Sequence, residues 1–458
     1  MLKEELVSMD ILTLFACFQP LVAFRTVRHF AIIAEAVLAM SGRCTMLGIS
    51  RWTGKGGSYR TVQRFFASSL PWTELLVRFF LAHLFAGETE YILAGDATTV
   101  TKSGKETHGI DRFFSGVVGK VVRGLEFFIF SLVDVRGRKS YPLTLKQMVR
   151  TEAEKEAIKK RKSQLKQKKK KRSGKKAKRG RPKGSRNKDK NKLEMSVELE
   201  RISNLPAGLM KLISVFVKIK YVAMDGHFGH NQAVLMAHFH GLELISKMRY
   251  DAALCEKYEG EQKKRGPKKK YGERLDYERL PVKYLKKSER KKDVITNYYN
   301  GIFLHEKFGC ELNVVIIQKL NVKTKKVGQA VLFSSDVELE WEKLVNYYSL
   351  RFQIEFNFRD AKQHFGLEDF MNVTKTGVEN AANLSFMMVN LSEKLLKNSD
   401  GRCVGINDLK SRYRGVKYAV ETIKMVMKKP EAILINQITE EIGRLGSIHQ
   451  PKLNLSPT

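Results

Sequence analysis

The sequence predicts an α/β fold in which helices flank a mixed β-sheet, a β-rich insertion interrupts that sheet, and helical regions precede and follow it. Two apolar runs, Tyr91–Asp96 and Tyr221–Asp225, have the composition of short buried strands, and each ends in an aspartate. A third segment, 347–362, places four polar side chains on one face of a helix. At 458 residues, the chain can bury a large core and form two to four domains.

The spacing of apolar residues along the chain predicts helical, α/β and β-rich regions. Residues before the first strand lack strand alternation, residues after 250 mix basic loops with alternating strands such as Leu312–Gln318, and the tail has helical spacing. We expect a helical region over 1–85, an α/β core over 86–250 and 331–370, a β-rich insertion over 251–330, and a helical region over 371–458. The helices expected in the tail are Val378–Leu396, Ile406–Tyr413 and Tyr418–Lys428.

The N-terminal region contains a pattern typical of two helices joined by a glycine turn. Residues 48–66 predict a short helix, the turn, and a second helix that begins after the N-cap Ser58. Arg60 and Arg64 share one face of that second helix, with the neighbouring apolar residues turned inward. A helix-turn-helix that binds DNA fits these residues, and so does a helical bundle with incidental arginines.

The α/β core is expected to begin with the strand that ends at Asp96. Gly116–Val122 and Leu125–Val135 predict two more strands of a meander, and Leu242–Met248 predicts the last strand of the core. Thr98 and Lys102 follow the first aspartate, where they either contact phosphates or lie in a solvated turn.

A strongly basic segment separates the two aspartates. Residues 159–192 hold 20 Lys and Arg against one acid, which accounts for +19 of the chain's net charge of +35. Because almost no apolar residues are present, we expect 155–194 to be a disordered insertion. Arg179 and Arg181 lie in a stretch that resembles an AT-hook, which inserts arginines into A·T-rich minor grooves; a sequence-independent basic tether is the alternative.

The helical face over 347–362 is the most informative feature. Tyr348, Arg351, Glu355 and Lys362 lie within about one third of the helix circumference. For an arbitrary charged helix, such a face is a solvated surface with ion pairs, and a single aspartate after a strand is usually a cap or turn residue. Two such aspartates with this glutamate instead supply three carboxylates for one divalent-cation site, and the cations beside them suit phosphates.

These residues resemble a known family. The spacing Tyr348-x2-Arg351-x3-Glu355-x6-Lys362 matches the YREK motif of cut-and-paste insertion-sequence transposases of the family-four type. Three other segments resemble the family's first-aspartate segment, its second-aspartate segment, and the strand before its glutamate helix: Gly95–Lys105, Met224–Phe228 and Leu332–Asp336.

The resemblance implies a ribonuclease-H-like catalytic core of the DDE type. It implies that Asp96, Asp225 and Glu355 hold Mg²⁺, with Mn²⁺ as a substitute, and that Tyr348, Arg351 and Lys362 contact phosphates. The expected partners are double-stranded DNA, namely the terminal inverted repeats and the target, and a second copy of the chain in a synaptic homodimer. The expected host compartment is the cytoplasm of a bacterium or archaeon.

The bulk properties agree with a nucleic-acid partner. A net charge of +35 calls for a polyanion. The five cysteines form no CxxC pair, which argues against a zinc module or disulfide framework. The most apolar N-terminal stretch, Leu21–Met40, is interrupted by charged residues, so neither a membrane span nor a signal peptide is expected. His227 and His230, just after the second aspartate, are expected to form hydrogen bonds or contact DNA rather than bind metal.

Two other classes of function remain open at this stage. A metal-dependent nuclease on the same fold would hydrolyse DNA without joining it. A catalytically idle DNA-binding remnant would bind DNA only, although three carboxylates near a polyanion would then repel it without a metal to offset their charge.

Overall fold

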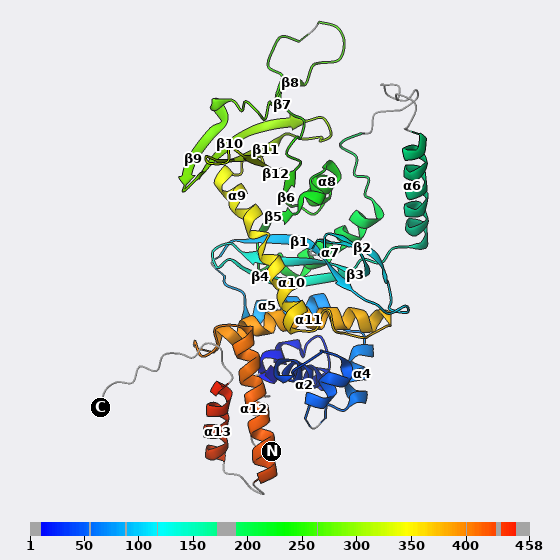
Figure 1. Cartoon of the computed structure of the whole chain (residues 1–458), viewed down its shortest axis with the longest axis vertical. Coiled ribbons are helices and arrows are strands. Elements are labelled where there is room, and N and C mark those ends of the chain that lie inside the picture. The colour runs from blue at the N-terminus through cyan, green and yellow to red at the C-terminus, as the bar shows by residue number, and fades with distance from the viewer. Residues whose placement is uncertain are drawn as a thin grey trace, which may run out of the picture.

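A computed structural model describes residues 11–171, 189–426 and 432–445, apart from the single residues 55, 88, 117, 263 and 400. Its centre is a mixed sheet flanked by helices, as the sequence predicts (Figure 1). Arg179 and Arg181 lie outside the described residues.

The described strands form one continuous sheet in the order β2-β3-β1-β5-β6-β12-β11-β10-β7-β8, with β4 paired to β3 and β9 paired to β10. The strands are β1 (Tyr91–Thr101), β2 (Asp111–Ser115), β3 (Lys120–Asp134), β4 (Lys139–Gln147), β5 (Ile219–Met224), β6 (Glu243–Met248), β7 (Leu254–Lys257), β8 (Tyr271–Arg274), β9 (Leu285–Lys291), β10 (Val294–His305), β11 (Leu312–Asn321) and β12 (Val327–Ser334).

The helices are α2 (Phe24–Ala39), α3 (Met46–Trp52), α4 (Tyr59–Ala67), α5 (Trp72–His83), α6 (Glu152–Lys171), α7 (Val197–Ile213), α8 (Asn231–Phe239), α9 (Trp341–Leu350), α10 (Gln353–His364), α11 (Lys375–Lys397), α12 (Ile406–Val426) and α13 (Ala432–Leu445). Short 3-10 turns lie at Ala16–Phe18 (η1), Gly226–Phe228 (η2) and Val282–Tyr284 (η3). None of the helices in the described part of the chain is both long and apolar enough to cross a membrane.

Five strands carry the candidate active site. β1 and β4 each pair antiparallel with β3, whereas β5 is parallel to β1 and to β6. The sequence missed β4 and split the meander wrongly, since Gly116–Val122 spans the β2–β3 turn and the first residues of β3. Because the apolar-polar alternation continues from one strand of this hairpin into the next, the position of the short turn between them is easily misjudged from the sequence.

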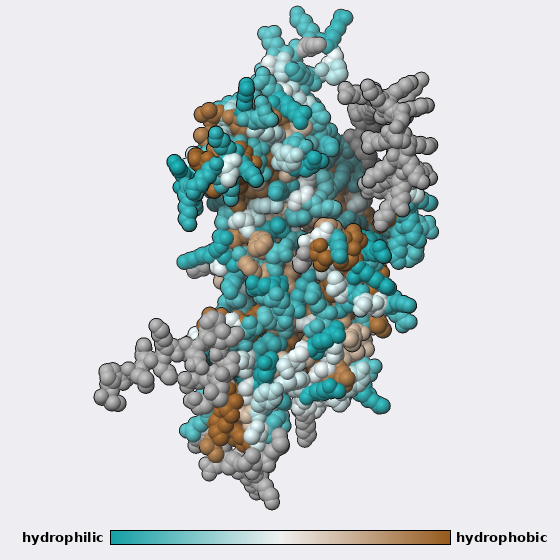
Figure 2. All heavy atoms as spheres, viewed as in Figure 1, coloured by the Kyte–Doolittle hydropathy of each residue, from teal (hydrophilic) through white to brown (hydrophobic). Residues whose placement is uncertain are grey.

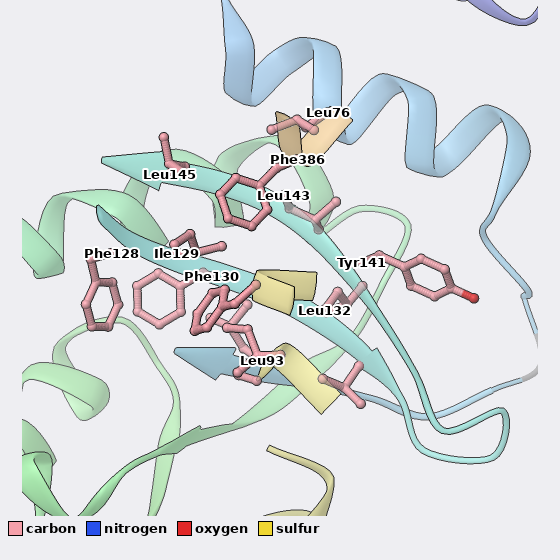
Figure 3. Packing of buried hydrophobic residues seen from close by; sticks show 14 of the residues in the cluster. Leu76, Leu93, Phe128, Ile129, Phe130, Leu132, Tyr141, Leu143, Leu145 and Phe386 are labelled. Atoms are coloured by element: carbon pink, nitrogen blue, oxygen red, sulfur yellow. The ribbon is translucent and has the colours of Figure 1, made fainter. Parts of the chain in front are cut away.

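Buried apolar side chains fix the helices on this sheet. Leu76 of α5 and Phe386 of α11 pack on Ile129, Leu143 and Leu145 of β3 and β4 (Figure 3). The buried Asn380 amide of α11 accepts a 2.7 Å hydrogen bond from Trp72 and donates to the Phe66 and Ser68 carbonyls at 2.8 Å. The N-terminal helices and α11 therefore share one core.

Two helical predictions are wrong in detail. Part of the basic insertion, expected to be disordered, is the helix α6. The tail, expected to have separate helices at Ile406–Tyr413 and Tyr418–Lys428, instead continues through Gly415 as α12. A side chain at Gly415 would approach the Ile442 carbonyl to 2.7 Å, so this glycine allows α12 and α13 to touch rather than ending a helix.

Most of the surface seen in Figure 2 is hydrophilic, as the charge of the chain requires. An apolar patch lies over the β2–β3 hairpin, where Phe114 and Val121 are exposed (Figure 2).

Candidate active site

The parallel pairing of β1 and β5 brings the two aspartates together. Gly95 is the Cα partner of Met224, so Asp96 and Asp225 are the next residue along each of two adjacent strands. Asp96 does not end its strand as predicted, because β1 continues to Thr101. Asp225 does follow the end of β5, as predicted.

The Asp96 carboxylate is nearly buried and is bonded on both oxygens. Its Oδ1 accepts a 2.8 Å hydrogen bond from the Ala97 backbone N–H, and its Oδ2 is ion-paired with the Arg351 guanidinium. Burial raises the pKa of Asp96 to about 6. Arg351 and the Ala97 N–H act to lower that pKa, while the charges of Asp225 and Glu355 raise it further. The charges of the other two predicted carboxylates therefore both act on Asp96.

Backbone contacts fix the position of Asp225 in the turn after β5. Its Oδ1 accepts a 3.1 Å hydrogen bond from the His227 N–H, which caps the short turn η2. Its carbonyl accepts a 2.7 Å bond from the Ser246 hydroxyl on β6. The loop carrying the second aspartate is thus capped within itself and tied to the neighbouring strand β6.

The predicted single helix over 347–362 is two helices. Tyr348 lies near the end of α9, Arg351 lies at the junction, and Glu355 and Lys362 lie on α10. The junction has i→i−3 hydrogen bonds, including Glu355 N–H to the Phe352 carbonyl at 3.0 Å, which tighten the chain without a proline or glycine.

Arg351 and Tyr348 of this segment lie beside Asp96, and Lys362 reaches the strand that carries Asp96. The Arg351 guanidinium carbon lies 5.7 Å from the centre of the Tyr348 ring. Burial raises the pKa of Tyr348, and the charges of Asp225 and Asp96 contribute in the same direction. Lys362 Nζ donates to the Thr99 carbonyl on β1 at 2.9 Å and lies 3.5 Å from Glu368.

The donor set suits a hard divalent cation, although its arrangement is not that of a formed metal site. Three carboxylates supply only oxygen atoms, which Mg²⁺ prefers. No three His, Cys, Asp or Glu side chains within the described residues lie close enough together to hold a metal ion. Arg351 instead neutralises Asp96, and its buried Nε has no hydrogen-bond partner in the described part of the chain.

A second cluster beside Asp225 was not predicted. Glu198, near the start of α7, lies 3.5 Å from the His227 ring and raises the pKa of that histidine. Glu126 on β3 is half-buried, and burial raises the pKa of its carboxyl to about 7. A glutamate within the apolar run 125–135 was the available signal, whereas nothing local in the sequence indicates that Glu198 lies nearby.

The structure also assigns contacts to residues whose role was left open. The His230 ring accepts a 3.3 Å hydrogen bond from the Ala233 N–H and so caps α8. Thr98 is buried. Lys102 lies over the Phe370 ring and donates to the Phe370 carbonyl at 2.7 Å, and burial lowers its pKa to about 8.

The N-terminal helix pair has the predicted local form. The Ser58 hydroxyl accepts a hydrogen bond from the Thr61 N–H and begins α4, whose residues Val62, Phe65 and Phe66 are buried. Arg60 and Arg64 are exposed on that helix.

Comparison with known proteins identifies the family. The family described as DDE superfamily endonuclease matches residues 13–298, a range that includes both aspartates and ends before Glu355. No curated protein matches the chain. Among solved structures, a piggyBac transposase synaptic complex with hairpin DNA matches 92% of this chain and 76% of its own chain, with 8% sequence identity. The TM-score of this match is 0.36. Because the family match spans more than half of its length, this chain belongs to the DDE superfamily endonucleases.

Proposed function

We propose that the chain is a DNA transposase that cleaves transposon ends and joins the freed 3′-OH to target DNA. The observation that carries this proposal is the register of β1 and β5, which sets Asp96 beside Asp225. Glu355 lies close enough to raise the pKa of Asp96. The meander followed by two parallel strands supports a ribonuclease-H-like core, and the YREK spacing supports the insertion-sequence type.

Asp96, Asp225 and Glu355 would hold Mg²⁺, or Mn²⁺ in its place. When bound, the metal supplies activation of the attacking hydroxyl and stabilises the leaving oxygen of the phosphodiester. For these carboxylates to act together, Arg351 must leave Asp96. A DNA phosphate beside the site offers the guanidinium a second anion to which it can bond bidentately.

The remaining residues of the segment would hold the DNA at the cut. Support comes from three contacts: Arg351 is ion-paired with Asp96, the Tyr348 ring lies against Arg351, and Lys362 donates to the Thr99 carbonyl on the strand of Asp96. A phenol, a guanidinium and an ammonium are suitable donors to phosphate oxygens. These side chains would fix the scissile phosphate against the carboxylates.

Other basic residues would bind DNA away from the cut. Arg60 and Arg64 project from a helix that begins after a turn, as in helix-turn-helix proteins. Arg179 and Arg181 would enter a minor groove. We further propose that two copies of the chain assemble on paired transposon ends, in the cytoplasm of a bacterium or archaeon.

A strand-transfer assay tests the proposal. Purified protein is incubated with a pre-cleaved transposon-end duplex and a supercoiled plasmid, with Mg²⁺ or with EDTA. Joined product that depends on Mg²⁺ is expected. Metal-dependent cutting without joining would instead identify a nuclease, and binding without either reaction would identify a remnant that only binds DNA.

A further inference from the structure

We propose that α6 is a DNA-binding arm that contacts the backbone of a duplex and is fixed to the catalytic core by the Glu154–Arg201 pair. The inference rests on the proposed function, because it takes DNA as the partner. It assigns a surface outside the active site. In Figure 1, α6 stands at the side of the sheet, next to β2 and β3.

Local interactions explain why so basic a segment is helical. The Glu154 carboxylate accepts hydrogen bonds from the Thr151 N–H at 2.7 Å and hydroxyl at 3.0 Å, while the Thr151 hydroxyl accepts from the Glu154 N–H at 3.3 Å. This reciprocal arrangement is a capping box. All three acids of α6 lie in its first five residues, and nine of its ten cations lie in 159–171, so the charges complement the helix dipole.

The basic part of α6 lacks enough acidic residues to neutralise it. Nine of the thirteen residues over 159–171 are Lys or Arg, and none is acidic. Lys159 and Lys160 are exposed. Like charges three and four residues apart destabilise a helix, and DNA phosphates would remove that cost by replacing counterions. A helix of 20 residues is about 30 Å long, close to one turn of B-DNA.

The start of α6 is held on the core by two sets of contacts. Arg201 of α7 donates to both carboxylate oxygens of Glu154, at 3.2 and 2.5 Å, and both side chains are about four-fifths buried. Arg150, just before α6, donates to the Arg112 carbonyl on β2 at 2.8 Å and lies over the Phe113 ring at 4.4 Å. A freely moving tether would not need such contacts.

The same helix α7 reaches the active site. Glu198 lies one turn before Arg201, and its carboxylate faces the His227 ring, while the His227 N–H holds Asp225. Glu154 of α6 and the loop that carries Asp225 therefore contact adjacent turns of α7, at Arg201 and Glu198. DNA bound along α6 would have a defined position relative to the cut.

The first test measures the salt dependence of DNA binding. Lys159→Gln with Lys160→Gln should reduce the slope of log affinity against log salt by about 1 to 2, since each lost phosphate contact removes about 0.9. The matched control is Lys211→Gln with Lys218→Gln, which removes the same charge from exposed lysines at the far end of α7 and just after it. Fluorescence anisotropy with a labelled duplex gives both slopes. Equal slopes for the two variants would overturn the proposal.

The second test separates position from charge. Glu154→Gln keeps a capping side chain but breaks the ion pair with Arg201. Because it removes one negative charge, it also raises the net charge of the protein by one. Charge alone would strengthen binding, whereas a misplaced α6 would weaken it severalfold. Glu152→Gln changes the net charge by the same amount, at an exposed residue whose one partner among the described residues is Lys155. This variant should bind DNA at least as well as the wild type. If Glu154→Gln binds DNA as tightly as Glu152→Gln does, the proposal that the Glu154–Arg201 pair fixes α6 to the core is overturned.

The outcomes also separate this inference from the proposed function. A wild-type protein that binds no duplex at low salt would defeat the transposase proposal itself. If the wild type binds DNA but the α6 variants bind like their controls, only the proposal that α6 is a DNA-binding arm is overturned.

Discussion

The Arg351 guanidinium, at the junction between α9 and α10, is ion-paired with the carboxylate of Asp96 on β1. Both side chains are about 85% buried, and burial raises the pKa of Asp96 despite the pair. The arginine therefore occupies one oxygen of a carboxylate that the proposed metal site would use. We propose that this contact links phosphate binding to metal binding.

Arg351→Gln should bind Mn²⁺ more tightly than the wild type in the absence of DNA, by about tenfold, because a charge-assisted bond of about 1.5–3 kcal/mol no longer competes for Asp96. Isothermal titration calorimetry measures this affinity without any reaction. Arg359→Gln on α10 is the control, since that side chain is exposed and pairs with Asp360. Equal affinities in wild type and Arg351→Gln would contradict the link.

Glu126→Gln should stabilise the protein at pH 8 more than at pH 5. The pKa of Glu126 is raised from 4.5 to about 7, so the folded state holds this proton more tightly than the unfolded state. Its contribution to stability is complete below about pH 4.5 and is lost as the pH rises through about 7. Glutamine cannot ionise and escapes that loss, which is on the order of 3 kcal/mol. Thermal melts of both proteins across this range measure the difference; a gain that shrinks toward pH 8 would refute the assignment.

Arg60→Ala with Arg64→Ala should weaken binding to the transposon end by about 1–3 kcal/mol for each lost base contact, with a smaller effect on unrelated DNA. Arg25→Ala with Arg28→Ala removes the same charge from exposed positions on α2 and serves as the control. Competition gel shifts with specific and unrelated duplexes report the ratio. An equal loss on both duplexes would show that α4 provides charge but no sequence recognition.

Asn380→Ala should lower the free energy of unfolding by about 3 kcal/mol or more, because it leaves the Trp72 N–H and two carbonyls of the α4–α5 connection buried without partners. Asn383→Ala is the matched control: among the described residues, its amide donates only to the Glu379 carbonyl in its own helix. Urea denaturation gives both values. Similar losses for the two variants would show that the N-terminal helices do not depend on this link.

The residues of the candidate site could be predicted because each carries a local signal. Asp96 and Asp225 end apolar runs, and four polar residues share one helical face. The register that places Gly95 opposite Met224 could not be predicted, since it joins segments more than 120 residues apart. Glu198 was missed for the same reason: only the tertiary fold brings α7 to His227.

Two other differences between the predicted and the observed helices have separate causes. The basic insertion has too few apolar residues to form a core, yet its capping box and charge distribution suffice for the helix α6. The break between α9 and α10 falls at Arg351 and Phe352, and neither arginine nor phenylalanine is a residue type that ends helices. That break comes from tertiary packing around the aspartates, which the periodicity of one segment does not contain.

We propose that Asp96, Asp225 and Glu355 together hold one metal centre. Its most direct test is metal rescue of Asp225→Cys, with Asp336→Cys as a control for a carboxylate that instead bonds Lys220 and Tyr221. Thiolate is a poor ligand for Mg²⁺ and a better one for Mn²⁺. We predict that Asp225→Cys loses cleavage of end DNA with Mg²⁺ and regains it with Mn²⁺, whereas the ratio of the two activities in Asp336→Cys equals that of the wild type. Undiminished cleavage by Asp225→Cys with Mg²⁺ would contradict the claim.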